Sequence, residues 1–113
     1  NNIESSELPN LYKHSQLYIF SSYCEVFGLT SLEAMTQGCP VLISNTSALP
    51  EINDTASDYF DPDNIADIKN KIKKILIDEN YKNDLIEKGE RHFKKFTWEH
   101  NVKKTLDEIY NLD

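Results

Sequence analysis

The 113-residue sequence is poor in the residues that mark several protein classes. Two cysteines, Cys24 and Cys39, are too few for a disulfide framework, and three glycines with four prolines exclude a collagen-like chain. The cysteines have no zinc-ligand spacing, so we expect two free thiols in a reducing cytoplasm. His14, His92 and His100 are scattered along the chain. We expect them at the surface or at edges, and we expect no protein-bound metal.

Long apolar runs and cations are also scarce. No run approaches the ~18 apolar residues of a membrane-spanning helix, and the first residues lack the basic start of a secretory signal. The net charge is −7, and residues 1–68 hold ten acidic residues against one cation, Lys13. Such a chain repels phosphate, so we expect no nucleic-acid partner. The length and the 39% hydrophobic content fit one globular domain.

Short apolar runs alternate with amphipathic segments in the first half of the chain. The pattern predicts a helix over residues 7–15, strands over 17–20, 41–43 and 57–60, a helix over 29–37, and a loop over 44–54. Continuous apolar strands are covered on both faces. We therefore predict the α/β class, with a partial doubly wound, Rossmann-like parallel sheet of about three strands.

The second half reads as helix throughout. Isoleucines follow the helical period after Asn64, a predicted N-cap, and lysines occupy the opposite face. Further helices are predicted over 81–96, with Gly89 as a weak point, and over 98–112 as a C-terminal tail. A complete doubly wound domain usually has five or six strands, so the pattern is typical of the later part of such a domain.

The strongest candidate site lies where the first strand ends. Ligands of open parallel sheets bind beyond the carboxyl ends of the strands, where residues 21–28 lead into a helix. A helix start with Gly28 beside it favours a phosphate. Glu25 lies in this loop and Glu33 in about the first turn of the helix, and carboxylates accept hydrogen bonds from vicinal diols. These features indicate a nucleotide-sugar pocket.

A structural interpretation fits the same residues. The segment from Thr30 to Glu33 matches a capping box, in which the glutamate only closes the helix start. Glu25 then becomes a solvated loop acid, and Gly28 serves only a turn. The residues alone leave both interpretations open.

Motif order adds a family resemblance. Residues 25–33 resemble the E-x7-E signature of retaining glycosyltransferases with the GT-B fold. The closest group is family 4, the glycosyl transferases group 1, and the resemblance extends from about residue 8 to residue 110. The matching motifs are Ser21–Ser22, Leu32–Met35, Gly38, Pro40–Val41, Pro50–Glu51, Asp61–Asp63 and Phe96–Trp98.

The resemblance implies a role for each site residue. Glu25 would contact the transferred sugar and is the candidate catalytic residue, as nucleophile or as orienter. The main chain around Val26, Phe27, Gly28 and Leu29, with Thr30, would meet the sugar and the diphosphate of the donor. Glu33 would hold the ribose hydroxyls.

The resemblance also implies the reaction and its partners. The expected enzyme is a hexosyltransferase that moves sugar from a nucleotide-sugar donor to an acceptor sugar or lipid-linked glycan, with retention and without cofactor or bound metal. We expect it in bacterial polysaccharide or glycolipid synthesis, in the cytoplasm or at the inner face of the membrane. Lysines 69, 71, 73 and 74 fit peripheral membrane contact or, alternatively, a solvated helix face.

Two departures from the family pattern suggest a fragment. Residues 47–49 are Ser-Ala-Leu where the family commonly has a Gly-Gly pair, and the family's diphosphate-binding cations would precede Asn1. We expect residues 1–113 to be the later part of a C-terminal nucleotide-sugar-binding domain, inactive without an N-terminal domain. The alternatives are a non-catalytic GT-B-type binding module and a sugar-nucleotide isomerase.

Overall fold

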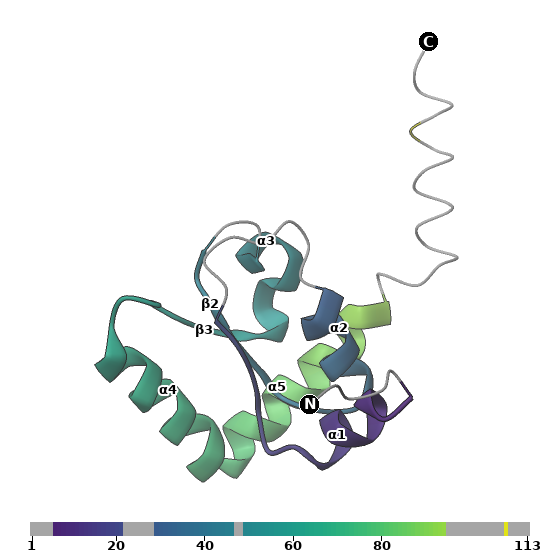
Figure 1. Ribbon diagram of the computed structural model, residues 1–113, viewed down its shortest axis with the longest axis horizontal. Helices are drawn as coiled ribbons and strands as arrows, with labels where there is room; N and C mark the ends of the chain where they lie inside the picture. The colour runs from purple at the N-terminus through teal and green to yellow at the C-terminus, as the bar shows by residue number, and fades with distance from the viewer. Residues whose placement is uncertain (1–5, 22–28, 47–48, 95–107, 109–113) are drawn as a thin grey trace.

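A computed structural model describes residues 6–21, 29–46, 49–94 and 108. Its three strands, β1 (Tyr18–Phe20), β2 (Val41–Ser44) and β3 (Asp58–Phe60), form one parallel sheet in the order β1-β2-β3 (Figure 1). The helices are α1 (Leu8–His14), α2 (Leu29–Thr36), α3 (Leu49–Asn53), the 3-10 helix η1 (Asp54–Ala56), α4 (Ile65–Ile77) and α5 (Glu79–Phe93). The predicted α/β class with a three-stranded parallel sheet is confirmed.

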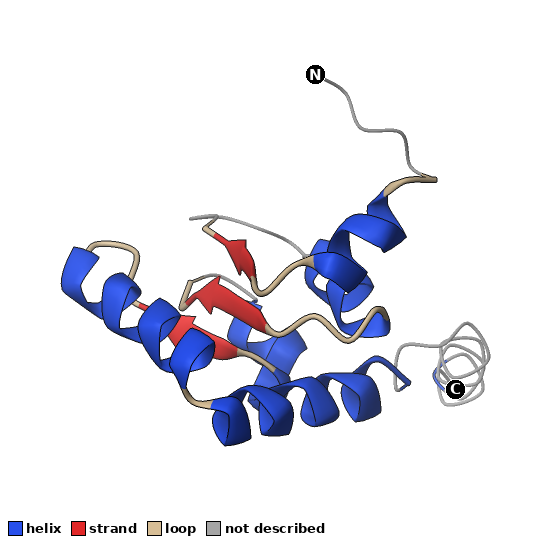
Figure 2. Cartoon of the chain, turned by 90° about the horizontal axis from the view of Figure 1, so that it is seen from below, coloured by secondary structure: helices blue, strands red, loops and turns tan. Residues whose placement is uncertain are grey.

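The central strand β2 explains why the apolar runs are continuous. Helices lie on both sides of the strands (Figure 2), and all four residues of β2 are buried. Val41 and Ile43 point into one core, and Leu42 points into the other. Full burial of each such side chain contributes roughly 1.5–3 kcal/mol, so polar residues in β2 would be costly on either face.

The two cores share one helix. The larger core joins α1, α2, β2 and α3, and the smaller joins β2, β3, α4 and α5. Leu85 of α5 belongs to the smaller core, whereas Phe93 packs against the larger one. α5 therefore connects the two layers of the domain.

Side-chain caps define the starts of the long helices. The Asn64 side chain accepts a hydrogen bond from the Asp67 backbone N–H at 3.1 Å, which confirms the predicted N-cap of α4. Asp78 caps α5 through the Tyr81 N–H at 3.0 Å. α5 consequently begins at Glu79 and ends at Phe93, earlier than predicted at both ends. The helix predicted over 98–112 lies outside the described residues.

The predicted loop over residues 44–54 is partly wrong, because its end forms α3. Pro50 is tolerated in the first turn, where its missing N–H leaves no helical hydrogen bond unmade. The Asn53 amide donates to the Leu49 carbonyl at 2.9 Å, and both side chains are fully buried. The buried side chain of Leu49 and the hydrogen bond that Asn53 makes within α3 stabilise this helix, which is too short to show a periodic sequence pattern.

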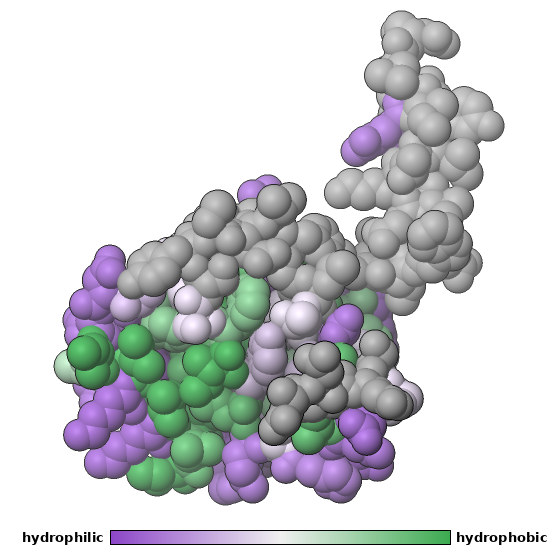
Figure 3. All heavy atoms as spheres, in the orientation of Figure 1, coloured by the Kyte–Doolittle hydropathy of each residue, from purple (hydrophilic) through white to green (hydrophobic). Residues whose placement is uncertain are grey.

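Only part of the isoleucine stripe of α4 faces the core. Ile75 is fully buried, whereas Ile65 is 82% exposed and Leu76 is 44% exposed. In Figure 3, hydrophobic side chains gather on the face that shows α4. Lys71 of the same helix pairs with the buried Asp58 of β3 at 3.3 Å. The lysines were predicted on the face opposite the isoleucines, which is wrong for Lys69 and Lys73, because both line the hollow along α4 together with the isoleucines.

One prediction for α5 was wrong. His92 is 8% exposed rather than at the surface, and its Nε2 lies 2.6 Å from the Ile52 carbonyl oxygen. Gly89 is also a packing position, because a Cβ there would lie 3.1 Å from Cγ of Met35. His14 is exposed as expected, and His100 lies outside the described residues.

Candidate functional site

The site predicted at the end of β1 is described in part. The structure places β1 directly before residues 22–28, so Glu25, Val26, Phe27 and Gly28 lie outside the described residues. Leu29 is the first residue of α2, as predicted for the helix that follows the loop. The described part of the site is therefore the first half of α2 and the elements packed against it.

Thr30 is fixed from the sheet side. Its Oγ1 accepts a hydrogen bond from the Tyr18 hydroxyl at 2.8 Å, which joins the first turn of α2 to β1. Because α2 already begins at Leu29, Thr30 lies inside the helix rather than at its N-cap. Glu33 is the fifth helical residue, at about the end of the first turn, as expected. The capping-box interpretation therefore does not describe this helix start.

Glu33 borders a hollow between two helices. The hollow has a volume of about 270 Å³. Its lining residues are Leu8, Pro9 and Tyr12 of α1 and Glu33, Thr36 and Gln37 of α2. The Glu33 side chain is exposed, whereas its neighbours Leu32 and Ala34 are buried, as the helical period requires. The carboxylate can therefore reach a ligand from a rigid, well-packed helix.

Tyr12 is the polar neighbour of this carboxylate. Its pKa is raised, mainly by burial, then by the charges of Tyr18 and Glu33 and by a side-chain hydrogen bond with Glu33. The hydroxyl is thus a neutral donor near pH 7, and the carboxylate is its acceptor. The Tyr12 ring packs edge-to-face on Tyr18, with centroids 5.5 Å apart. The packing of the Tyr12 ring of α1 on Tyr18 of β1 therefore fixes the position of the Tyr12 hydroxyl beside Glu33.

No cation neutralises Glu33 within the part of the chain that the structure describes. The ion pairs found there join Lys71 to Asp58 and Lys88 to Asp84, both in other elements. The described ranges also hold no cluster of His, Cys, Asp and Glu suited to a metal ion. The hollow at Glu33 thus offers a negatively charged acceptor, which suits neutral hydroxyls better than phosphate.

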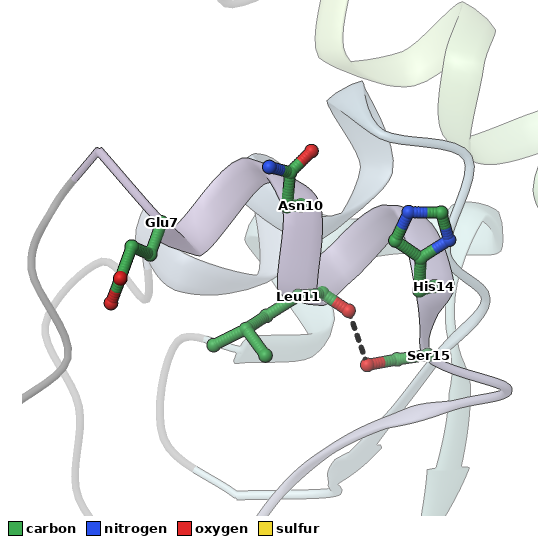
Figure 4. Close-up of a pocket in the computed structure, with 5 residues that line it drawn as sticks. All are labelled: Glu7, Asn10, Leu11, His14 and Ser15. Carbon is green, nitrogen blue, oxygen red and sulfur yellow. Dashed lines mark hydrogen bonds between the residues drawn. The ribbon is translucent and has the colours of Figure 1, made fainter.

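Two other hollows lack convergent polar groups. One, of about 520 Å³, follows the outer side of α1 (Figure 4). Its side chains spread along the helix, and Ser15 donates to the Leu11 carbonyl rather than to a shared point. The other, also about 520 Å³, follows α4 and is lined mainly by isoleucines. No helix among the described residues is long and apolar enough to cross a membrane.

Comparison with known proteins identifies the family. The model of the family described as Glycosyl transferases group 1 matches residues 1–92. The chain belongs to this family. The resemblance noted in the motif order is therefore confirmed at the family level.

Named relatives of this group 1 chain are considerably longer. O-antigen chain mannosyltransferase B of Escherichia coli is 32% identical over 105 residues, covering 93% of this chain and 28% of that protein. D-inositol 3-phosphate glycosyltransferase of Salinispora tropica is 33% identical over 106 residues, covering 89% and 21%. The chain thus spans less than a third of the length of these relatives.

A solved structure supports the fold of the group 1 chain. Sucrose-phosphate synthase from Thermosynechococcus elongatus matches with a TM-score of 0.82 and 24% identity, over all of this chain and 30% of that chain. At this level of sequence identity, the match shows a shared fold and nothing about function. It agrees with the predicted GT-B architecture.

Sequence reasoning missed residues that hold α2 of this group 1 domain in place. Ser31, fully buried, donates to Oδ1 of Asn53 at 2.8 Å. This bond joins α2 to α3, and it satisfies a polar group that would otherwise be costly to bury. A serine one position before Leu32 on the buried side of α2 was the available signal. Nothing in the sequence pattern pointed to Asn53 as its partner.

Proposed function

We propose that this chain is the donor-binding part of a retaining glycosyltransferase of the hexosyl type. In this proposal, the parent enzyme moves sugar from a nucleoside-diphosphate sugar to a hydroxyl of an acceptor sugar or lipid-linked glycan. The observation that carries it is Glu33, an exposed carboxylate without a described cation partner, at a hollow beside the helix that follows β1. A vicinal diol matches such a carboxylate, because it donates two hydrogen bonds to it.

The rest of the proposed site continues toward the strand end. Glu33 would take the ribose hydroxyls, and the start of α2 near Thr30 would take the diphosphate, since helix starts favour anions. Glu25 would contact the transferred sugar, with the main chain of residues 26–29 beside it. The separation of a carboxylate for diols from a helix start for phosphate avoids repulsion between like charges.

The named relatives differ in their substrates. One relative is named as a mannosyltransferase and another as a glycosyltransferase of D-inositol 3-phosphate. Their names share glycosyl transfer and differ in the substrate. We therefore propose glycosyl transfer without choosing a base, sugar or acceptor.

A domain proposal follows from the sheet. Among the described residues, β1 is an edge strand, and Ile19 on it is 43% exposed. Ile65 and Ile77 of α4 are also largely exposed. We infer that residues 1–113 are the later part of a C-terminal domain, and that further strands and helices of the parent protein cover this apolar face. The acceptor-binding domain and the cations for the diphosphate would belong to the parent as well.

A cytoplasmic location is also proposed. Burial raises the pKa of the Cys39 thiol to about 11, so this free cysteine stays protonated and unreactive. A free buried thiol suits a reducing compartment. We do not extend the proposal to membrane contact, because Lys71 pairs with Asp58 and Lys74 lies 4.0 Å from the centre of the Tyr81 ring.

The test uses the parent protein and a set of uridine, guanosine and adenosine diphosphate sugars. Release of nucleoside diphosphate in the presence of a glycan acceptor measures transfer. With the active donor, Glu33→Gln should raise KM about tenfold, since a hydrogen bond to a charged group contributes roughly 1.5–3 kcal/mol. Glu87→Gln, an exposed change on α5, is the matched control and should leave KM unchanged.

The alternatives give different results in the same assay. A non-catalytic module would bind a nucleotide-sugar without releasing diphosphate. An isomerase would convert the sugar nucleotide without an acceptor. An unchanged KM in Glu33→Gln, together with a lower melting temperature, would contradict the role proposed for Glu33.

A further inference from the structure

We propose that Tyr12 is a positioning residue, which holds the Glu33 carboxylate so that one of its oxygens faces the ribose diol of the donor. This inference rests on the proposed function, because it assigns a partner to the residue proposed to bind ribose. Tyr12 itself would not contact the reacting atoms. Its role would be to fix the direction of an otherwise exposed acidic side chain.

The geometry places the two groups on opposite walls of one hollow. Tyr12 comes from α1 and Glu33 from α2, and both line the space of about 270 Å³ between these helices. Tyr12 is the buried residue of α1, with 9% of its surface exposed. A buried hydroxyl and an exposed carboxylate therefore line the same hollow, and a hydrogen bond between them would restrict the side-chain freedom of Glu33.

A tyrosine suits this task better than a cation would. A carboxylate has two oxygens with about four acceptor positions, and one phenol hydroxyl occupies a single position. The remaining positions stay available to a diol. Lysine or arginine would neutralise the charge and, in a bidentate pair, would engage both oxygens. The Tyr12 hydroxyl orients the carboxylate while leaving its charge in place.

Tyr12 is itself held by the sheet. Its ring meets Tyr18 edge-to-face at 5.5 Å with an interplanar angle of 79°. Tyr18 stacks on Phe20 with ring centroids 6.3 Å apart. The Tyr18 hydroxyl donates to Thr30 at the start of α2. The aromatic row of α1 and β1 thus fixes both Glu33 and the helix start where the diphosphate is proposed.

The experiment is a double-mutant cycle on the parent protein. Calorimetric titration with UDP, GDP and ADP first identifies the diphosphate that binds. Its Kd is then measured for wild type, Tyr12→Phe, Glu33→Gln and the double variant, each also with the 2′-deoxy and 3′-deoxy nucleotides. Tyr81→Phe, whose hydroxyl bonds Asp58 in the other core, is the matched control. Melting temperatures of all variants are recorded.

The expected result is a coupled loss. Tyr12→Phe should weaken binding of the ribonucleotide about fivefold, as removal of one ordinary hydrogen bond predicts. It should have no further effect in the Glu33→Gln background or on the deoxynucleotide that lacks the contacted hydroxyl. Tyr81→Phe should not change Kd. A loss of the same size in the Glu33→Gln background or with both deoxynucleotides would overturn the positioning role and indicate a packing role instead.

Failure of the proposed function is distinguishable from failure of this inference. If wild-type protein binds none of the three diphosphates, the donor site itself is wrong and the inference falls with it. If wild type binds and Glu33→Gln weakens binding, but Tyr12→Phe does not, only the positioning role of Tyr12 is rejected.

Discussion

At the scale of single residues, Gly89 allows α5 to pack closely on α2. A Cβ at this position would lie 3.1 Å from Cγ and 3.5 Å from Cβ of Met35. Met35 is 1% exposed and belongs to the larger core, so it has little room to move. Gly89 therefore stabilises the contact between α5 and α2, because the missing Cβ leaves space for the Met35 side chain.

Gly89→Ala should destabilise the chain by about 1 kcal/mol. The change gains about 1 kcal/mol of helix propensity but overpacks the contact with Met35, which typically costs about 1–3 kcal/mol. Urea denaturation of the 113-residue chain measures the difference. In a Met35→Ala background the clash is absent, and the same change should raise stability by about 0.5–1 kcal/mol. Equal effects in both backgrounds would exclude the packing explanation.

The residue types at the site could be predicted, but their partners could not. The helical period placed Glu33 on the exposed side of α2, because Leu32 and Met35 fix the buried side. Tyr12 precedes Glu33 by 21 positions, and no sequence period relates residues on different helices. Pairings of this kind depend on how α1 packs on α2, which is a tertiary property.

At the scale of elements, α3 depends on its contacts with α2 and α5. Ser31 of α2 binds Asn53, and His92 of α5 binds the carbonyl of Ile52. Since a carbonyl oxygen only accepts, Nε2 of His92 must carry the proton in this bond. Two side-chain bonds from different helices thus hold a five-residue helix, which would be unstable alone.

His92→Phe should lower stability by about 1–3 kcal/mol, because it keeps an aromatic ring but leaves the part-buried carbonyl of Ile52 without this donor. Denaturant unfolding followed by circular dichroism gives the value. The matched control is His14→Phe at an exposed position of α1, which should change stability by no more than about 0.5 kcal/mol. Similar small effects of both changes would show that the His92 bond does not hold α3.

Element prediction succeeded where one pattern was strong. The run from Val41 to Ile43 identified β2, because a strand covered on both faces is mostly apolar. α3 was missed because five residues that include Pro50 give no helical period. The exposure of Ile65 was missed as well, because the helical period of the sequence does not show which part of an apolar stripe packs against the sheet.

At the scale of the whole molecule, one face of the domain is strongly apolar. Ile19 of β1 and Ile65 and Ile77 of α4 are exposed, and the hollow along α4 is lined by apolar side chains with Lys69 and Lys73 at its border. Exposed apolar patches of this kind mark interaction surfaces.

The isolated 113-residue chain should therefore self-associate as its concentration rises. Sedimentation velocity at about 10 and 200 µM should show a concentration-dependent increase in mass, since burying apolar surface contributes roughly 25 cal/mol per Å². The double change Ile65→Glu and Ile77→Glu should restore the monomer. Ala66→Glu, which adds charge at an exposed neighbour, is the control and should not. A monomer at both concentrations would contradict this prediction.

The position of α5 in the chain has a consequence for biosynthesis. α5 ends at Phe93 and packs on both cores, although the sheet that it closes ends at Phe60. A nascent chain on the ribosome can pair its three strands, yet Met35 and Leu42 remain without their α5 contacts until residue 93 has emerged from the exit tunnel. Chaperones would therefore meet the three described strands before α5 covers either core, and the packing of both cores must follow the translation of α5.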